Sequence, residues 1–487
     1  MTADRIALGV ILLIVLTGTV AGICARSGRK MNLEEWSVAG RSFGVIFVWF
    51  LMAGEIYTTF AFLGASGWAF SRGGPALYIL AFNTLGYVIS FYTLPAIWHL
   101  GRRFGLQTQS DFFEKRYGSG VLGIFVSLLG VLFVVPYLQI QLTGVGIIVQ
   151  VASYGQIPRN VSMLIAVSAV AAFVYLGGMR SIAWVSVLKD VLMVIAALSV
   201  GVYVPIHYFG GISPLFARLV ETHPSHLTMP GATSTLGHSW YVSTVILSAC
   251  GYFMWPHTFS TAFSAKSAKT LRRNAVVTPL YTMSLVFILI AGFATLLIEP
   301  SLKNGDMSLL TLARKTFSPW FLGVIGGAGA LTAMVPAGII LLTASTLFAK
   351  NVIRPLAKVE SDETVARIAR ITVFLLALLS FVLATHSSAT LVALLLLGYA
   401  GISQLFPGVV LGLFWERTTK RAVTSGLVLG LLISGILMLS KHDPFHGFNA
   451  GFVALAANFV TVFCMSLTTA PQPNPFVVRI NSADRQE

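Results

Sequence analysis

FLMAGEIYTTF, at residues 50–60, is an apolar stretch that carries a glutamate, Glu55, followed by a tyrosine and two threonines. It lies within an apolar run over residues 43–71, which is long enough to cross a bilayer as a helix. A carboxyl group at that depth costs at least about 2.5 kcal/mol on insertion scales, so it is tolerated where it faces a cavity or a partner. We therefore expect the helix to break beside Gly54 and Glu55 to serve a functional site, with helix packing by a protonated Glu55 as the alternative.

The composition of the chain is that of a membrane protein. Of its 487 residues, 56% are hydrophobic and 10% are charged, whereas roughly a quarter of residues are charged in soluble globular proteins. Apolar runs of about 20 residues recur, and we predict an all-α integral membrane protein with about thirteen transmembrane helices. The predicted spans are residues 6–25, 43–71, 75–101, 120–153, 160–177, 181–207, 240–265, 275–298, 317–349, 368–386, 389–414, 421–440 and 447–470.

The basic residues predict how these helices are oriented. About 23 of the 32 Lys and Arg residues fall on one side of the predicted membrane and about eight on the other, and the basic side faces the cytoplasm. This indicates a multi-pass protein of the inner (plasma) membrane with its N-terminus outside and its C-terminus in the cytoplasm. Arg26, Arg29 and Lys30 follow the first apolar run in place of a small-residue cleavage site, so we expect a retained helix. The net charge of +15 therefore reflects topology, and no nucleic-acid binding is expected.

Lys189 and Asp190 are two further ionisable residues inside a predicted span, residues 181–207. Adjacent side chains on a helix point about 100° apart. We therefore expect that the two do not face the same spot, and that one is functional and the other structural. The Lys189 stem can alternatively extend toward the cytoplasmic end of the span.

GYFMWPH, at residues 251–257, is a second interruption of an apolar run. Pro256 removes a backbone hydrogen bond in the middle of a predicted span, although proline in a transmembrane helix is often only a kink. If spans two to six and seven to eleven form two repeats, each interruption falls in the first helix of a repeat, which indicates the central site of a transporter. Half-helices that begin at the breaks would direct positive dipole ends at the middle of the membrane, which favours an anion or carboxylate.

Seven segments in order carry a family resemblance: NLEEWSVAGRSFG (32–44), FLMAGEIYTTF (50–60), GLQTQSDFFEKRYGS (105–119), VPYLQIQLTG (135–144), GGMRSIAWVSVLKD (177–190), GYFMWPH (251–257) and FPGVVLGLFWERTTKRAVTSG (406–426). In them the chain resembles the sodium:solute symporter family, and within it the monocarboxylate permeases. The resemblance implies a LeuT-like fold with a five-plus-five inverted repeat, one extra N-terminal helix and two extra C-terminal helices, working by alternating access. The implied division is an extra helix at 1–30, repeats at 31–210 and 211–418, and two helices with a short tail at 419–487.

The resemblance also implies roles for single residues. Glu55 stands where the family has its coupling-linked membrane carboxylate, and Ala53 and Ile56 stand where the unwound helix offers carbonyl groups to sodium. The chain departs from the family pattern at Val335 and Pro336, which stand where sodium-coupled members have two hydroxyl residues. Neither side chain can ligate a hard cation through oxygen.

A second departure concerns Ser186, which stands where the family usually has an aspartate, while Lys189 adds a positive charge one turn further on. Burial lets a carboxyl group or an amine exchange a proton near neutral pH. We therefore expect Glu55, Lys189 and Asp190 to act in coupling, with protons as the driving ion and sodium as the alternative. If a sodium site survives, its candidate ligands are Ala53, Ile56 and Thr332.

Polar residues at the breaks and on neighbouring spans predict the substrate site. Helix N-termini and a lysine ammonium stabilise a carboxylate better than a neutral sugar hydroxyl, so we expect import of a small monocarboxylate such as lactate or pyruvate. The alternatives are a sodium-coupled symporter of an amino acid such as proline or alanine, and a transporter-like membrane sensor. A glutamine inside an apolar helix is often only a helix–helix contact. The candidate substrate-binding residues are Gly54, Tyr57, Thr58, Tyr137, Gln141, Tyr252, Pro256 and Gln404.

The sequence gives no indication of an enzyme, because it contains neither a nucleophile elbow, nor an HExxH motif, nor a pair of acids suited to catalysis. Cys24, Cys250 and Cys464 form no CxxC motif or Cys/His cluster, so we expect neither a disulfide nor a metal centre. We assign no role to the histidines, which lie mainly in predicted external loops. The expected partners are an organic-acid substrate and the lipid bilayer, with no cofactor and no obligate protein partner.

Overall fold

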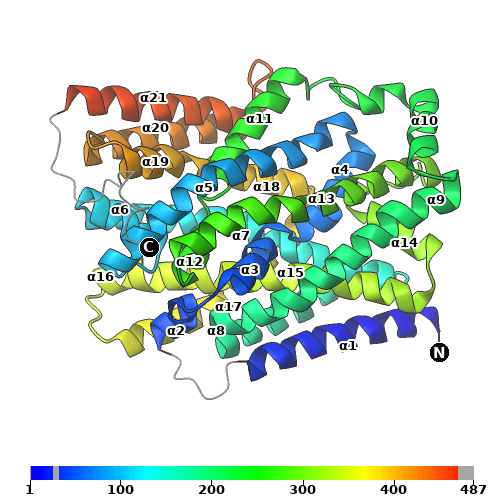
Figure 1. Cartoon of the computed structure of the whole chain (residues 1–487), viewed down its shortest axis with the longest axis horizontal. Helices are drawn as coiled ribbons and strands as arrows, with labels where there is room; N and C mark the ends of the chain where they lie inside the picture. Colours follow the sequence, from blue (N-terminus) through cyan, green and yellow to red (C-terminus); the bar gives the residue numbers. More distant parts are fainter. Residues whose placement is uncertain (1, 26–31, 470–487) are drawn as a thin grey trace.

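The computed structural model describes residues 2–25 and 32–469, and in these residues it is built of helices, with isolated bridges in place of strands. Figure 1 shows the long helices running across the molecule, with α1 along one edge and α20 and α21 along the opposite edge. The α-helices are α1 (Ala3–Cys24), α2 (Leu33–Val38), α3 (Val45–Ile56), α4 (Ala65–Ser71), α5 (Tyr78–Phe104), α6 (Gln109–Tyr117), α7 (Gly120–Ala152), α8 (Arg159–Leu198), α9 (Val204–Phe209), α10 (Ile212–Thr222), α11 (His238–Gly251), α12 (Pro256–Ser264), α13 (Ala268–Ile298), α14 (Ser308–Thr316), α15 (Pro319–Phe348), α16 (Arg354–Leu356), α17 (Asp362–His386), α18 (Leu391–Ile402), α19 (Phe406–Phe414), α20 (Lys420–Leu439) and α21 (Ala450–Thr468). Short 3₁₀ or π segments are η1 (Ala39–Arg41), η2 (Phe60–Gly64), η3 (Gly74–Leu77), η4 (Ser199–Tyr203), η5 (Pro224–Leu227), η6 (Gly305–Met307), η7 (Ala349–Ile353) and η8 (Ser403–Leu405).

Helix α15 forms the core of the molecule. It is almost entirely buried and packs against α1, α7 and α8. A Cβ atom at Gly326 would lie 2.7 Å from Ile11, and one at Gly327 would lie 2.6 Å from Ile14, so these glycines let α1 approach closely. Small residues at helix crossings are how membrane helices pack without a hydrophobic driving force. The predicted extra N-terminal helix is therefore attached directly to the core helix.

The described residues contain ten helices long and apolar enough to span a membrane, or eleven if α3 and the bent segment after it are one span. The sequence predicts about thirteen spans, and two features account for the difference between eleven and thirteen.

The stretch Arg159–Phe209 has 51 residues. At 1.5 Å per residue it is about 76 Å long, which is more than twice the thickness of a bilayer core. Gly178, with φ 65° and ψ −166°, interrupts it, so it holds the two helices predicted at 160–177 and 181–207. Helices α11 and α12 together occupy the span predicted at 240–265, and each alone is too short to be counted.

Both interruptions predicted from the sequence are breaks in helices. Helix α3 ends at Ile56, slightly later than predicted, and Tyr57 leaves the helical conformation with φ −89° and ψ 78°. The chain bends by 58° there before it continues as η2 and α4. Helix α11 ends at Gly251, and Pro256 begins α12. Proline suits the first position of a helix, where its missing N–H is not needed, so Pro256 starts a half-helix and does not kink a continuous one.

The two broken helices meet near the centre of the molecule. Helix α3 packs against α8, α12, α13 and α15, and Figure 1 shows α3 beside α12 in front of α15. This arrangement brings the two breaks together.

Part of the predicted membrane orientation depends on residues outside the described ranges. These residues are Arg26, Arg29, Lys30 and the segment 470–487.

Candidate functional site

Lys189 places its ammonium group against the break in α3. Its Nζ donates to the carbonyl oxygen of Tyr57 at 3.1 Å and to that of Ala53 at 3.4 Å. The C-terminal end of a helix leaves carbonyl groups without partners and carries a partial negative charge. The break is therefore a favourable place for a cation, and Lys189, which is completely buried, supplies one.

Asp190 pairs with Lys189, so the expectation that these neighbours do not face the same spot is wrong. Oδ1 of Asp190 lies 2.5 Å from Lys189 Nζ and accepts a hydrogen bond from the Tyr281 hydroxyl of α13 at 3.1 Å. The two Cβ directions differ by about 100°, but the long lysine stem reaches around the helix to its neighbour. Removing one partner of a buried pair leaves an unpaired charge and costs about 3–5 kcal/mol. The two residues therefore form one unit.

Glu55 joins the two broken helices. Its carboxyl group contacts the Thr261 hydroxyl of α12, and its backbone carbonyl accepts from the Tyr137 hydroxyl of α7 at 2.9 Å. Thr261 is absent from the residues predicted from the sequence. The available signal was the concentration of hydroxyl residues Thr258, Ser260 and Thr261 within a predicted span.

A small buried cavity lies beside Glu55 at the two breaks. The predicted residues that line it are Glu55, Tyr137 and Tyr252. Most of its wall is apolar or aromatic, with a few polar groups, which is the lining usual for small-molecule sites. Its volume of about 20 Å³ has room for about one water molecule in this conformation. The full lining is Glu55, Phe60, Ala61, Phe82, Asn83, Tyr137, Tyr252, Trp255, His257, Thr258, Leu285, Leu395 and Tyr399.

Asn83 and His257 also line this cavity, and sequence reasoning missed both. Oδ1 of Asn83 accepts from the Tyr252 hydroxyl at 2.5 Å. His257, in the first turn of α12, is 3% exposed, and its Nδ1 has no hydrogen-bond partner in the described part of the chain. Buried polar atoms normally have a partner, so this nitrogen is available to a ligand. The position of His257 directly after Pro256 was the signal that the sequence offered.

Two predicted substrate residues act elsewhere in this structure. Gln141 accepts from the Thr59 hydroxyl at 2.8 Å, which holds the chain just beyond the first break. Gln404 donates to the carbonyl of Gly451 at 3.3 Å and accepts from Asn458 at 3.2 Å, so it ties η8 to α21. Gln404 therefore makes a helix–helix contact, which the sequence left open as the alternative to substrate binding.

Gly54, Tyr57 and Thr58 lie at the first break but do not line the cavity. A Cβ atom on Gly54 would lie 3.0 Å from Ser186 Oγ and 3.1 Å from the Val335 side chain. Glycine here lets α3 approach α8 and α15 closely. Val335 consequently packs directly against the broken helix.

The candidate sodium ligands are only partly brought together. The Ala53 carbonyl accepts from Lys189, and the Thr332 hydroxyl donates to the carbonyl of Ala328 in its own helix at 2.7 Å. The side chain of Ile56 lies outside the described residues. Of these predicted sodium ligands, the Ala53 carbonyl is therefore already contacted by an ammonium group of the protein, whereas the Thr332 hydroxyl, as a donor, keeps its oxygen lone pairs.

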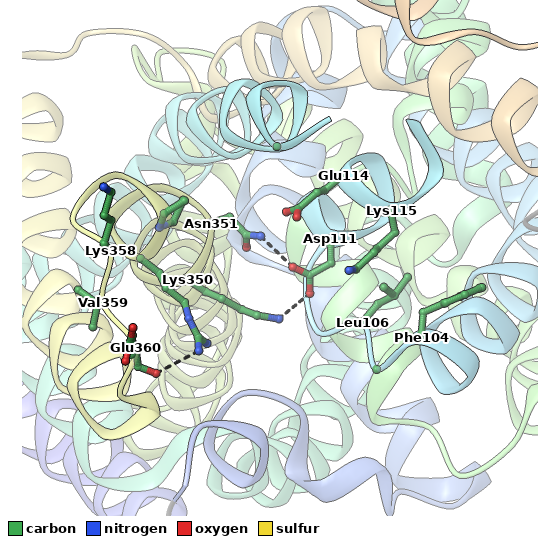
Figure 2. A pocket seen from close by; sticks show the side chains of 14 residues that line it. Phe104, Leu106, Asp111, Glu114, Lys115, Lys350, Asn351, Lys358, Val359 and Glu360 are labelled. Carbon is green, nitrogen blue, oxygen red and sulfur yellow. Dashed lines mark hydrogen bonds and ion pairs between the residues drawn. The ribbon is translucent and has the colours of Figure 1, made fainter. Parts of the chain in front are cut away.

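A second cavity, of about 690 Å³, opens at the end of the molecule where α6 and α16 lie (Figure 1). Figure 2 shows charged side chains facing one another across it: Asp111 accepts from Lys350 at 2.6 Å and from Asn351 at 2.8 Å. Burial raises the pKa of Asp111, but Lys350, Asn351 and backbone N–H groups outweigh burial and hold the pKa below its ordinary value. Asp111 is thus ionised and paired. The cavity beside Glu55, unlike this one, lies at the two helix breaks, so we take it as the candidate solute site.

The comparisons with known proteins agree with one another. A model of the sodium:solute symporter family matches residues 36–430. The chain is 42% identical over 476 residues to the uncharacterized symporter YhjB of Bacillus subtilis (strain 168), covering 95% of this chain and 97% of that protein. It is 28% identical over 491 residues to a monocarboxylate transport permease protein of Rhizobium johnstonii, covering 96% of this chain and 98% of that one. A solved Na⁺-coupled sialic acid symporter, substrate-bound and outward-open, aligns with a TM-score of 0.79 over 97% of this chain and 99% of that chain at 15% identity, which confirms the predicted fold.

Proposed function

The chain belongs to the sodium:solute symporter family, and we propose that it imports a small monocarboxylate, such as lactate or pyruvate, together with a proton. Family membership makes it a secondary active symporter of small solutes and a multi-pass membrane protein. The proposal adds the substrate, the coupling ion and the direction. It also places the N-terminus outside and assigns residues 31–210 and 211–418 to the two inverted repeats, as the distribution of basic residues and the paired breaks favour.

The position of Lys189 carries the proposal for the coupling ion. A hard cation such as sodium needs several oxygen ligands. Here the Lys189 ammonium already donates hydrogen bonds to the carbonyls of Ala53 and Tyr57. The Val335 side chain, which packs against the same break, has no oxygen to offer a cation. A second cation beside the ammonium would be repelled. A proton needs no such cage, because one titratable group holds it.

Glu55 links the coupling ion to the substrate, because it lines the cavity. A proton that enters from outside neutralises Glu55 or restores the Lys189 ammonium. Either change favours an anion in the cavity, whereas a Glu55 carboxylate would repel it. When the proton is lost to the cytoplasm, the anion is held less strongly and leaves on the same side.

The chemistry of the cavity lining favours a small anion as the substrate. His257 and Thr258 lie in the first turn of α12, where backbone N–H groups and the helix dipole favour negative charge. Tyr252 and Trp255 provide aromatic walls that suit a short apolar group. A monocarboxylate such as lactate has both parts. The relative described as a monocarboxylate transport permease points in the same direction.

Competition for uptake tests the substrate. Purified protein in sodium-free proteoliposomes with an inward proton gradient is expected to take up labelled lactate. An excess of unlabelled pyruvate or acetate should remove most of this uptake, because each presents the same carboxylate to the cavity, while glucose should leave it unchanged. Proline and alanine test the amino-acid alternative. Competition by amino acids or sugars, but not by short acids, would contradict the proposal.

A further inference from the structure

We propose that His257 selects the substrate, because its Nδ1 forms a hydrogen bond to an oxygen on the carbon next to the carboxylate. This role rests on the proposed uptake of a monocarboxylate and narrows the class of substrate. The preferred substrates are then 2-hydroxy and 2-oxo acids, such as lactate and pyruvate. Short acids without that oxygen, such as propionate, are disfavoured.

His257 carries a buried nitrogen whose hydrogen bond is unused. It lines the cavity beside Glu55. It is 3% exposed, and its Nδ1 has no partner among the residues that the structure describes. Buried polar atoms are normally paired with protein atoms or with ordered water. This nitrogen therefore keeps one hydrogen bond for the molecule that occupies the cavity.

Other polar side chains of the cavity wall are already engaged. The Tyr252 hydroxyl donates to Asn83 Oδ1 at 2.5 Å, and the Asn83 amide nitrogen donates to the carbonyl of Ile79 at 2.6 Å. The Tyr137 hydroxyl donates to the backbone carbonyl of Glu55 at 2.9 Å. These groups shape the cavity and leave the recognition of a substrate oxygen to the imidazole.

Two aromatic rings hold the imidazole of His257 in place. The Trp255 ring stacks on it, with the centroids 5.9 Å apart and the planes 27° apart. The Tyr137 ring centroid lies 5.7 Å from it on the other helix, α7. A side chain whose rotamer is fixed by packing directs its hydrogen bond to one place. His257 therefore selects an oxygen by its position in the substrate.

The carboxylate and the neighbouring oxygen of the substrate need different partners. The N-terminus of α12 favours the carboxylate, because backbone N–H groups and the helix dipole stabilise negative charge. His257 is the second residue of this helix, so its side chain extends from the same end. An imidazole nitrogen donates or accepts according to the tautomer, so Nδ1 suits a 2-oxo group as well as a 2-hydroxyl. Acids that lack this oxygen keep the carboxylate contacts and still compete when they are in excess.

The cavity has to widen before an acid of this size fits, because it has room for about one water molecule in this conformation. Helix α11 ends at Gly251 and α12 begins at Pro256, so the two half-helices can move as hinged bodies. His257 moves with α12. Its hydrogen bond is therefore made as the widened cavity closes around the substrate.

His257→Phe tests the role by comparing lactate with propionate, which differs from lactate by one hydroxyl group. Phenylalanine keeps a ring between the two aromatic side chains and removes the hydrogen bond. We expect kcat/KM for lactate to exceed that for propionate about tenfold in the wild type, the effect of one hydrogen bond. The variant should take up both acids equally well, because only lactate loses a contact. His257→Asn is the matched control, since its amide places a hydrogen-bonding atom near the position of Nδ1, and it should keep the preference for lactate.

Uptake of the two labelled acids is measured in proteoliposomes with inward gradients of both protons and sodium, so the result does not depend on the coupling ion. Uptake by protein-free liposomes is subtracted. An unchanged preference for lactate in His257→Phe would overturn the role. Equal losses for both acids would also overturn it, because that pattern marks a residue that holds the carboxylate or only packs. Wild-type protein that takes up neither acid would instead show that the proposed function is wrong, and this role with it.

Discussion

Lys189→Ala is expected to abolish accumulation of the substrate against its gradient and to lower the melting temperature, because an unpaired buried charge costs about 3–5 kcal/mol of stability. The substitution leaves Asp190 buried without its partner and removes the ammonium from the carbonyls of Ala53 and Tyr57. Uptake of labelled lactate into sodium-free proteoliposomes with an inward proton gradient measures the effect.

The double variant Lys189→Met with Asp190→Asn separates lost coupling from misfolding. Methionine retains much of the lysine stem, asparagine can still accept from Tyr281, and no unpaired charge stays buried. We expect a melting temperature near that of the wild type and still no accumulation. Accumulation at the wild-type level by either variant would show that coupling does not depend on the pair.

Glu55→Gln is expected to eliminate accumulation while exchange of substrate across the membrane persists. Glutamine keeps the size of the side chain and a hydrogen bond to Thr261, but it cannot be titrated. The carrier would then keep a neutral group beside the cavity in both states and could not couple binding to a proton. Parallel measurements of net uptake and of counterflow exchange distinguish the two activities.

Thr261→Val is the matched control for Glu55, because it removes the hydroxyl partner and leaves the carboxyl group. We expect it to accumulate the substrate, with a changed affinity at most. Full accumulation by Glu55→Gln would refute the coupling role. If Thr261→Val lost accumulation while Glu55→Gln kept it, the loss would be due to packing between α3 and α12 and not to titration of Glu55.

The backbone breaks could be predicted because their causes are local. A carboxylate within an apolar run, and a proline within another, are costly in a continuous membrane helix, and this is visible in the sequence. The turn at Gly178 was anticipated only as a gap between two apolar runs. Its positive φ, which glycine tolerates, explains why the helix is interrupted there without a loop.

Side-chain partners could not be predicted in the same way, because they depend on how far a side chain reaches and on helices distant in the sequence. Helix periodicity separates Lys189 from Asp190, yet the lysine stem brings their charged groups together. His257 was set aside with the loop histidines, but packing of α12 beside α3 turns it into the cavity wall. Gln141 and Gln404 were polar residues in apolar spans, and only tertiary packing shows that they brace other segments.

The measurement that tests proton coupling most directly compares two gradients in one preparation of proteoliposomes. With choline in place of sodium on both sides and an inward proton gradient, we predict accumulation of labelled lactate beyond that in protein-free liposomes, which report diffusion of the neutral acid. With an inward sodium gradient at equal pH, we predict no accumulation. No uptake with the proton gradient, and recovery when the sodium gradient is applied at equal pH, would contradict the account.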